Sequence, residues 1–214
     1  MTLNDELKKS ENRKALAEAR YYEHMARGAK VKADEAEREQ ALIAATEYEN
    51  RIYTFDGAVR SASVQHAIAE LGLWVRRDPS KPIKVIFNSP GGGVFDGMAL
   101  YDYIQQIRQE TRVDTVALGM AASMGGVLLQ AGETRTMSKH SYLLIHEVSG
   151  GSIGKTSEME DELRFSKKLQ DRLLEILAER STLTKQQIAR RWRKTDWWLS
   201  AEESRELGFC DLVT

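Results

Sequence analysis

The sequence predicts an α/β protein, because segments typical of strands alternate along the chain with segments typical of helices. Short apolar runs rich in β-branched and aromatic residues predict strands, and longer stretches with helical periodicity predict helices. The expected strands lie near residues 51–55, 83–87, 113–118 and 142–148, and the expected helices lie near 62–76, 95–108, 124–131 and 157–180.

Residues 1–48 differ in composition from the rest of the chain. They are dense in Glu, Asp, Lys, Arg and Ala and contain Gly28 but no proline, whereas all three prolines lie between positions 79 and 90. We predict a charged N-terminal segment over 1–48, helical or partly disordered, and a folded domain over 49–214. The segment carries only a thin apolar stripe, formed by Leu3, Leu7, Leu16, Met25 and Val31.

A single serine lies in the small-residue segment 119–126, between a predicted strand and a predicted helix. Unpaired N–H groups at a helix N-terminus favour negative charge beside Ser123. The alternative is that Ser123 only caps the helix. The neighbouring small residues leave room for another backbone, which an ordinary cap does not need, and so favour a nucleophile: Ala121, Ala122, Gly125 and Gly126.

The second informative segment, residues 88–93, reads Asn-Ser-Pro-Gly-Gly-Gly and follows a predicted buried strand. A simple turn is the alternative, but three consecutive glycines exceed what a turn needs. Pro90 stiffens the entry, and the glycines adopt positive φ at little steric cost. The loop is therefore suited to aim backbone N–H groups at one point, as stabilisation of an oxyanion requires.

These two segments, together with Gly97-Met98 and Tyr101-Asp102, resemble the proteolytic subunit of the Clp protease in order and spacing. The resemblance extends from about residue 49 to 213. It implies the fold shared by Clp proteolytic subunits and crotonases, in which ββα units repeat and a long handle helix protrudes. Residues 49–214 would then form a serine peptidase domain.

Carried over to this sequence, the resemblance implies that Ser123 is the nucleophile, His146 the general base and Asp196 the acid that orients the histidine. It also implies that the N–H groups of Gly92 and Met124 form the oxyanion hole. Such a mechanism uses side chains and backbone groups alone, so neither a metal nor a cofactor is expected.

The resemblance further implies that substrate binds to the backbone at Gly91 and to a glycine-rich segment that contains Gly150 and Gly151. In the family, the equivalent segment pairs with the substrate backbone. Pairing of this kind holds a peptide with little dependence on its sequence.

Four histidines compete for the role of base: His24, His66, His140 and His146. Alternation along the predicted strand places His146 on one face with Tyr142, Leu144 and Val148. A buried core histidine is therefore the alternative, and the serine and glycine segments favour the catalytic interpretation.

Asp196 lies in a loop before a capping box formed by Ser200 and Glu203. Two tryptophans follow it directly, which predicts a largely buried site. Without the resemblance it could be an ordinary polar loop residue, and three other acids remain candidates for its role: Glu147, Asp102 and Asp211.

The long helix near 157–180 is expected to begin with a capping box formed by Ser157 and Glu160. Its apolar residues lie broadly on one face and need a partner. In the family the equivalent helix joins two stacked heptameric rings that enclose the active sites, so we expect a homo-oligomer. The apolar residues are Met159, Leu163, Leu169, Leu173 and Leu177.

An ATP-dependent unfoldase is a candidate partner, because the family works with one. Ile86 and Gln106 stand where the family often has aromatic residues that receive the unfoldase, and residues 1–48 replace its usual N-terminus. We hypothesise that this segment gates the chamber, binds a different partner, or acts as a prosegment, as in phage-encoded relatives that process capsid proteins.

The net charge of −1 gives no general attraction to nucleic acid or to an anionic membrane. Cys210 is the single cysteine, which excludes an intrachain disulfide, favours a reducing compartment and is expected to pack as a small hydrophobic residue. No apolar run is long enough to span a bilayer. The sequence therefore predicts a cytoplasmic protein.

The predicted function is that of a serine endopeptidase in a self-compartmentalised ring, acting on unfolded polypeptides or peptides in intracellular degradation or processing. The alternatives are a phage-type capsid maturation protease, a crotonase-like acyl-CoA enzyme, and an inactive structural homologue. A serine–lysine peptidase would use Lys139 or Lys155 as its base.

Overall fold

The computed structural model describes residues 18–38, 49–151, 153–193 and 195–214. Residues 18–38 are helical and exposed, and they belong to a unit separate from the compact unit Asn50–Thr214. Part of the N-terminal segment is therefore helical, as the composition suggests. The predicted boundary at residue 48 lies outside the described residues, as do Leu3, Leu7 and Leu16.

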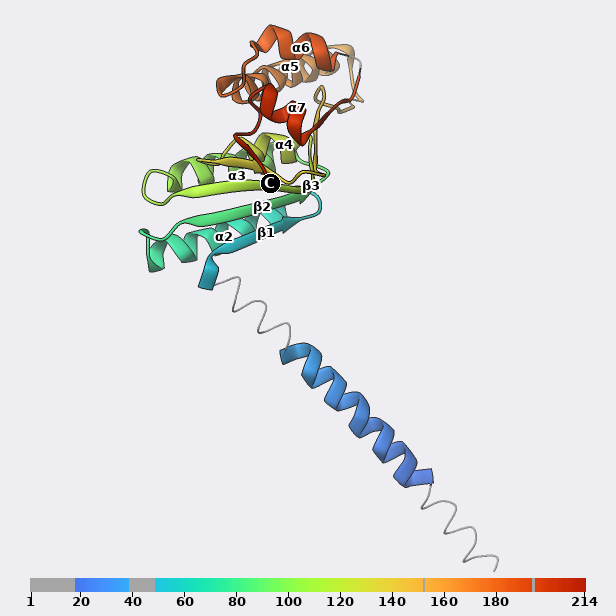
Figure 1. The fold of residues 1–214 in the computed structure, drawn as a ribbon. Helices are drawn as coiled ribbons and strands as arrows, with labels where there is room; N and C mark the ends of the chain where they lie inside the picture. The colour runs from blue at the N-terminus through green and yellow to red at the C-terminus, as the bar shows by residue number, and fades with distance from the viewer. Residues whose placement is uncertain (1–17, 39–48, 152, 194) are drawn as a thin grey trace, which may run out of the picture. The chain divides into compact units, whose positions relative to one another are not determined.

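The core of the compact unit is a sheet with the strand order β1-β2-β3-β4-β7, and all neighbours in this order are parallel (Figure 1). Two further strands extend it: β5 pairs in parallel with the second half of β3, and β6 pairs antiparallel with β5. The strands are β1 (Ile52–Asp56), β2 (Ile83–Ser89), β3 (Val113–Ala122), β4 (Arg135–Met137), β5 (Tyr142–Ile145), β6 (Trp197–Ser200) and β7 (Leu212–Val213).

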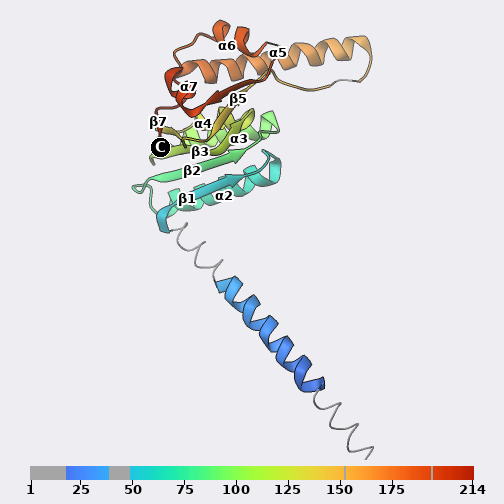
Figure 2. The ribbon, with the colours of Figure 1, turned by 45° about the vertical axis from the view of Figure 1, so that its right-hand side comes forward.

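Helices follow most strands, which confirms the predicted α/β class. They are α2 (Ser61–Arg77), α3 (Val94–Ile107), α4 (Met124–Leu129), α5 (Thr156–Glu179), α6 (Lys185–Trp192) and α7 (Ala201–Glu206). The N-terminal part of α5 projects beyond the sheet, as Figure 2 shows. Within the described residues, no helix has the length and hydropathy needed to cross a membrane.

Two strands differ in length from their predicted ranges. β3 continues to Ala122 because its second half finds a new partner: Thr115–Ala117 pair with β4, whereas Met120–Ala122 pair with β5. β5 ends at Ile145, so His146 follows the strand instead of lying within it.

The predicted start of the long helix is wrong by two residues. Lys155 is the N-cap of α5, and the Glu158 carboxylate accepts a hydrogen bond of 3.0 Å from the Lys155 N–H. Because this pair closes the first turn, Ser157 and Glu160 do not form the capping box. The second predicted box is confirmed, since Ser200 caps α7 and its N–H donates to Glu203 at 2.8 Å.

A continuous apolar core lies between the C-terminal half of α5, α6 and the strands β3, β5 and β6. Leu143 and Ile145 of β5 are buried in it, whereas Tyr142 is half exposed on the other face. Cys210 also packs there, as predicted, and burial raises the pKa of its thiol to about 11.

A buried arginine connects β4 to the segment before β7. Arg135 is 3% exposed and donates to both Asp211 oxygens, at 2.6 and 3.1 Å, and to the Gln130 side chain at 2.7 Å. Arg180 at the end of α5 adds a bond of 3.2 Å to Asp211. Burial alone would raise the pKa of Asp211, but the hydrogen bonds and charge of Arg135 hold it below its usual value.

Asp211→Asn is expected to destabilise the fold by about 1.5–2 kcal/mol, because the buried Arg135 loses its charged partner, while the 35% exposure of Asp211 reduces the loss below that of a fully buried pair. Since the folded-state pKa of Asp211 is lowered, its contribution is complete above about pH 4 and disappears as the pH falls through that pKa. Urea unfolding of both proteins at several pH values measures the difference.

The matched control is Asp161→Asn, which removes an ion pair between two exposed side chains of α5. It is expected to cost less than about 0.5 kcal/mol. Equal losses of unfolding free energy in the two variants would contradict a special role for the Arg135–Asp211 pair.

Candidate active site

Ser123 occupies the junction at which β3 ends and α4 begins. Its backbone is held at φ 54° and ψ −122°, a conformation that residues with a side chain rarely adopt. The Ser123 N–H donates to the Leu144 carbonyl at 2.9 Å, and the Ser123 carbonyl accepts from Gly126 at 3.0 Å. The hydroxyl makes no capping bond, although Ser123 is the N-cap residue. The simple capping interpretation is therefore wrong.

The glycine loop packs directly against this junction. Gly91 and Gly92 have φ values of 90° and 151°, and a Cβ on Gly91 would lie 2.5 Å from the Ser123 Cβ. Val59 fixes the loop from its other side, because its N–H donates to the Gly91 carbonyl and its carbonyl accepts from the Gly93 N–H. Only glycine allows both the backbone angles and the close approach.

The two predicted oxyanion donors line the same pocket as Ser123. Among the described residues, neither the Gly92 nor the Met124 N–H group donates a hydrogen bond to the protein. Met124 is the first residue of α4, so its N–H also lies at the positive end of the helix. Both groups are thus available to a ligand in the pocket.

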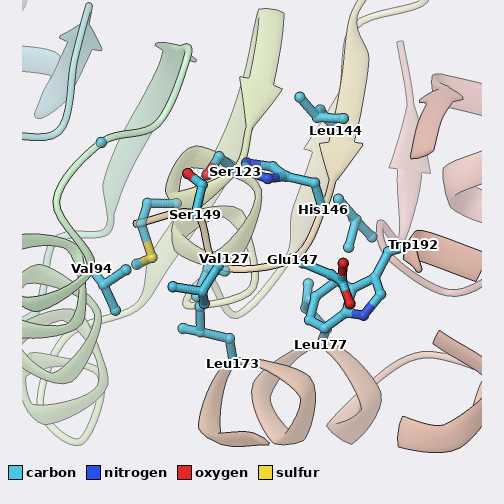
Figure 3. A pocket seen from close by; sticks show the side chains of 14 residues that line it. Val94, Ser123, Val127, Leu144, His146, Glu147, Ser149, Leu173, Leu177 and Trp192 are labelled. Atoms are coloured by element: carbon cyan, nitrogen blue, oxygen red, sulfur yellow. The ribbon is translucent and has the colours of Figure 1, made fainter. Parts of the chain in front are cut away.

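His146 lines this pocket as well, and Figure 3 shows its ring directed toward Ser123. The side chain is partly exposed and lies beyond the end of β5, so the alternative of a buried core histidine is wrong. His24 and His140 are exposed elsewhere, and His66 shares a 2.9 Å hydrogen bond with Tyr53. No hydrogen bond joins Ser123 to His146 within the part of the chain that the structure describes.

The pairing of β5 with β6 places Asp196 close to His146 in space. The register pairs Ile145 with Trp197 in antiparallel strands, so the residue after β5 and the residue before β6 are neighbours. Accordingly, His146 and Asp196 line one shallow depression beside the pocket, with Glu147, Trp192 and Thr195.

The expected burial of this site is wrong. Asp196 is exposed, and Trp198 is 48% exposed because β6 lies at the sheet edge and its outer face is uncovered. Among the competing acids, Asp102 is exposed on α3 and Asp211 is bound by arginines. Glu147 lines both the pocket and the adjoining depression, as His146 does.

The structure does not bring every predicted residue to the pocket. Gly91 contacts the Ser123 junction, but Gly150 and Gly151 are exposed, with no atom near the position of a Cβ. Neither Lys139 nor Lys155 lines the pocket, and no lysine occurs among its described lining residues.

The walls of the pocket were not identified from the sequence. Val127 lies one helical turn after Ser123, and Val94 follows the glycine loop directly. The sequence spacing of both residues could therefore have indicated that they lie beside Ser123. No pattern in the sequence pointed to Trp192. The remaining wall residues are Leu144, Ile145, Glu147, Val148, Ser149, Leu173 and Leu177.

Comparisons with known proteins place the sequence in a family. The chain matches the sequence profile of the family described as Clp protease over residues 34–214. It is 39% identical over 140 residues to the ATP-dependent Clp protease proteolytic subunit of Bacteroides fragilis strain ATCC 25285, covering 64% of this chain and 65% of that protein. The protein of the same name from strain YCH46 is also 39% identical over 140 residues, covering 64% of this chain and 61% of the relative.

The match thus spans slightly less than two thirds of the length of these relatives. The family profile, in contrast, covers the glycine loop, the Ser123 junction, the long helix and both strands that carry His146 and Asp196. On this evidence, the chain belongs to the Clp protease family.

Proposed function

We propose that this protein is a serine endopeptidase that hydrolyses peptide bonds at Ser123. The observation that carries the proposal is the strained backbone of Ser123, which holds a hydroxyl without a capping role in one pocket with His146 and two available N–H donors. Residues in rare backbone conformations cluster at active sites, where the strain positions a reacting group.

In the proposed reaction, the Ser123 Oγ attacks the substrate carbonyl while His146 takes its proton. The N–H groups of Gly92 and Met124 stabilise the oxyanion, an effect worth about 2.7–4 kcal/mol for each donor. His146 then gives the proton to the leaving amine, and water releases the acyl group by the reverse sequence. Asp196 holds the imidazole in the required orientation and tautomer.

The geometry also favours this proposal over an acyl-CoA reaction of the crotonase type. Such a reaction would use the two N–H donors for an enolate, but it would leave the strained serine and the neighbouring histidine without a role. A peptidase uses all four groups.

The names of the relatives support two further parts of the proposal, because both proteins are called proteolytic subunits of an ATP-dependent protease. We infer that this chain acts on unfolded polypeptides delivered by an ATP-dependent unfoldase. The candidate docking surface is the uncovered face of the sheet, where a depression includes Ile86, Leu118 and Leu212. Gln106 is exposed on α3 and does not line it.

Assembly into rings is supported by the first half of α5. Met159, Leu163 and Phe165 are 40%, 57% and 43% exposed, on a helix that projects from the body (Figure 2). Exposed apolar side chains that gather on one element mark an interaction surface. We propose that this half of α5 packs against other copies of the chain in stacked heptameric rings.

Ser123→Ala is expected to abolish labelling by a fluorophosphonate, because the reacting oxygen is absent. His146→Ala is expected to slow labelling by roughly 10²-fold or more, because no group removes the Ser123 proton. His140→Ala is the matched control on an exposed turn and should label at the wild-type rate. Intact mass spectrometry follows the reaction, and labelling that persists in Ser123→Ala would overturn the proposal.

Asp196→Asn is expected to lower kcat for a fluorogenic peptide by up to roughly 10⁴-fold, because asparagine favours the wrong imidazole tautomer. KM should change little, since the role assigned to Asp196 is to orient His146 and not to bind substrate. Asp102→Asn serves as the control and should retain wild-type kcat. If the Asp196→Asn protein kept wild-type kcat, the residue that orients His146 would be another acid and not Asp196.

Leu163→Glu is expected to reduce the oligomer to smaller species in sedimentation velocity at micromolar concentration, because a charge then faces the interface. Leu73→Glu introduces the same change at a 43% exposed leucine of α2 and should leave the assembly intact. A wild-type protein that sediments as a monomer would contradict the ring proposal directly.

A further inference from the structure

We propose that Ser89 is a positioning residue for the oxyanion hole: its buried hydroxyl holds the glycine loop so that the Gly92 N–H points into the pocket. The inference rests on the proposed peptidase function and deepens it, because it names a side chain outside the proposed triad on which the reaction depends. Ser89 does not line the pocket, so it acts through the backbone of the loop.

Ser89 is the last residue of β2, and its surface is 0% exposed. Its Oγ accepts a hydrogen bond of 3.1 Å from the Gly91 N–H, and both groups are buried. A buried N–H group costs free energy when it has no partner. The hydroxyl of Ser89 therefore fixes the first peptide group of the glycine loop.

The next peptide group of the loop is fixed by Val59. The Val59 N–H donates to the Gly91 carbonyl at 2.8 Å, and the Val59 carbonyl accepts from the Gly93 N–H at 2.9 Å. The Gly91 carbonyl and the Gly92 N–H belong to one planar trans peptide group, so they point in opposite directions. Because the carbonyl is bound to Val59, the Gly92 N–H is directed away from Val59, and Gly92 lines the pocket.

Gly91 is the pivot between these two peptide groups. Its φ of 90° is a value that glycine adopts readily, but glycine adopts negative φ about as readily. The backbone preference of Gly91 therefore does not by itself fix the direction of the Gly92 N–H. The hydrogen bonds from Ser89 on one side and Val59 on the other fix it. Donors that are already oriented stabilise an oxyanion better than donors that must first rotate.

Ser89 also packs against the turn that carries the second predicted donor. A Cβ on Gly125 would lie 3.2 Å from the Ser89 Cβ and 3.5 Å from its Oγ, so Ser89 lies on the first turn of α4. Met124, whose N–H is the second donor, directly precedes Gly125 in this turn. One small buried side chain thus contacts the supports of both donors.

The test compares Ser89→Ala with the wild type in the hydrolysis of a fluorogenic peptide. Ser204→Ala is the matched control, because Ser204 is also 0% exposed and its Oγ donates to the Ser200 carbonyl at 2.7 Å, and neither residue lines the pocket. Intact mass after complete reaction with a fluorophosphonate gives the concentration of active sites. The rate per active site is then independent of any loss of folded protein.

Inhibition by a peptide aldehyde is measured on the same proteins. Ser123 Oγ adds to the aldehyde carbon, the carbonyl oxygen takes the electron pair of the broken π bond, and the Ser123 proton passes to His146. The adduct carries an oxyanion in the position that the hole is proposed to stabilise. Its affinity therefore reports on the hole without turnover.

Ser89→Ala is expected to lower kcat per active site by roughly 10- to 100-fold, somewhat less than the loss of a whole oxyanion donor. KM should stay the same, and the dissociation constant of the aldehyde should rise by about the factor by which kcat falls. Ser204→Ala should keep the wild-type kcat and aldehyde affinity. Ser89→Cys keeps the shape with a weaker acceptor and should show a smaller loss of the same kind; it is the test variant if Ser89→Ala does not fold.

Other outcomes overturn the inference in distinguishable ways. A test variant with wild-type kcat per active site would leave Ser89 a structural role only, with the peptidase proposal intact. A raised KM with unchanged kcat would place the effect on substrate binding, and a lowered kcat with unchanged aldehyde affinity would place it outside the oxyanion hole. A wild type that reacts with neither the peptide nor the fluorophosphonate would overturn the peptidase proposal, and this inference with it.

Discussion

The contact between the glycine loop and the Ser123 junction is the constraint on which the site depends. β2 and β3 are parallel neighbours, and their register shifts where Ser89 lies opposite Ala121. The two chain segments that follow these strands therefore pack against each other. Without side chains at Gly91 and Gly92, the loop reaches van der Waals distance of the serine. One contact therefore sets both the position of the hydroxyl and the position of the N–H donors.

The second half of the site depends on an edge of the sheet. β3 is long enough to pair with β4 first and with β5 afterwards, and the β5 pairing brings His146 to the end of the strand that carries Ser123. The antiparallel strand β6 then returns Asp196 to the same end. Residues that are far apart in the chain thus lie near one another, because β3 and β5 end, and β6 begins, at neighbouring places.

The long helix α5 has two different halves. Its C-terminal half is part of the core and contributes Leu173 and Leu177 to the pocket wall, whereas its N-terminal half is exposed and projects from the body. Any assembly formed through the exposed half would act on a helix that also shapes the substrate pocket. The proposed assembly and the proposed peptide binding would therefore depend on one and the same helix.

Sequence alone predicted the alternation of strands and helices, the Ser123 turn and the glycine loop, because these depend on local periodicity and on the absence of side chains. It did not predict that Leu143 and Ile145 face the core, that Asp196 is exposed, or that Lys155 caps α5. Strand length, register and edge position decide those features, and they arise from pairing between distant segments. For the same reason the apolar pocket walls and Trp192 were visible only in the tertiary structure, where packing selects which side chains face one cavity.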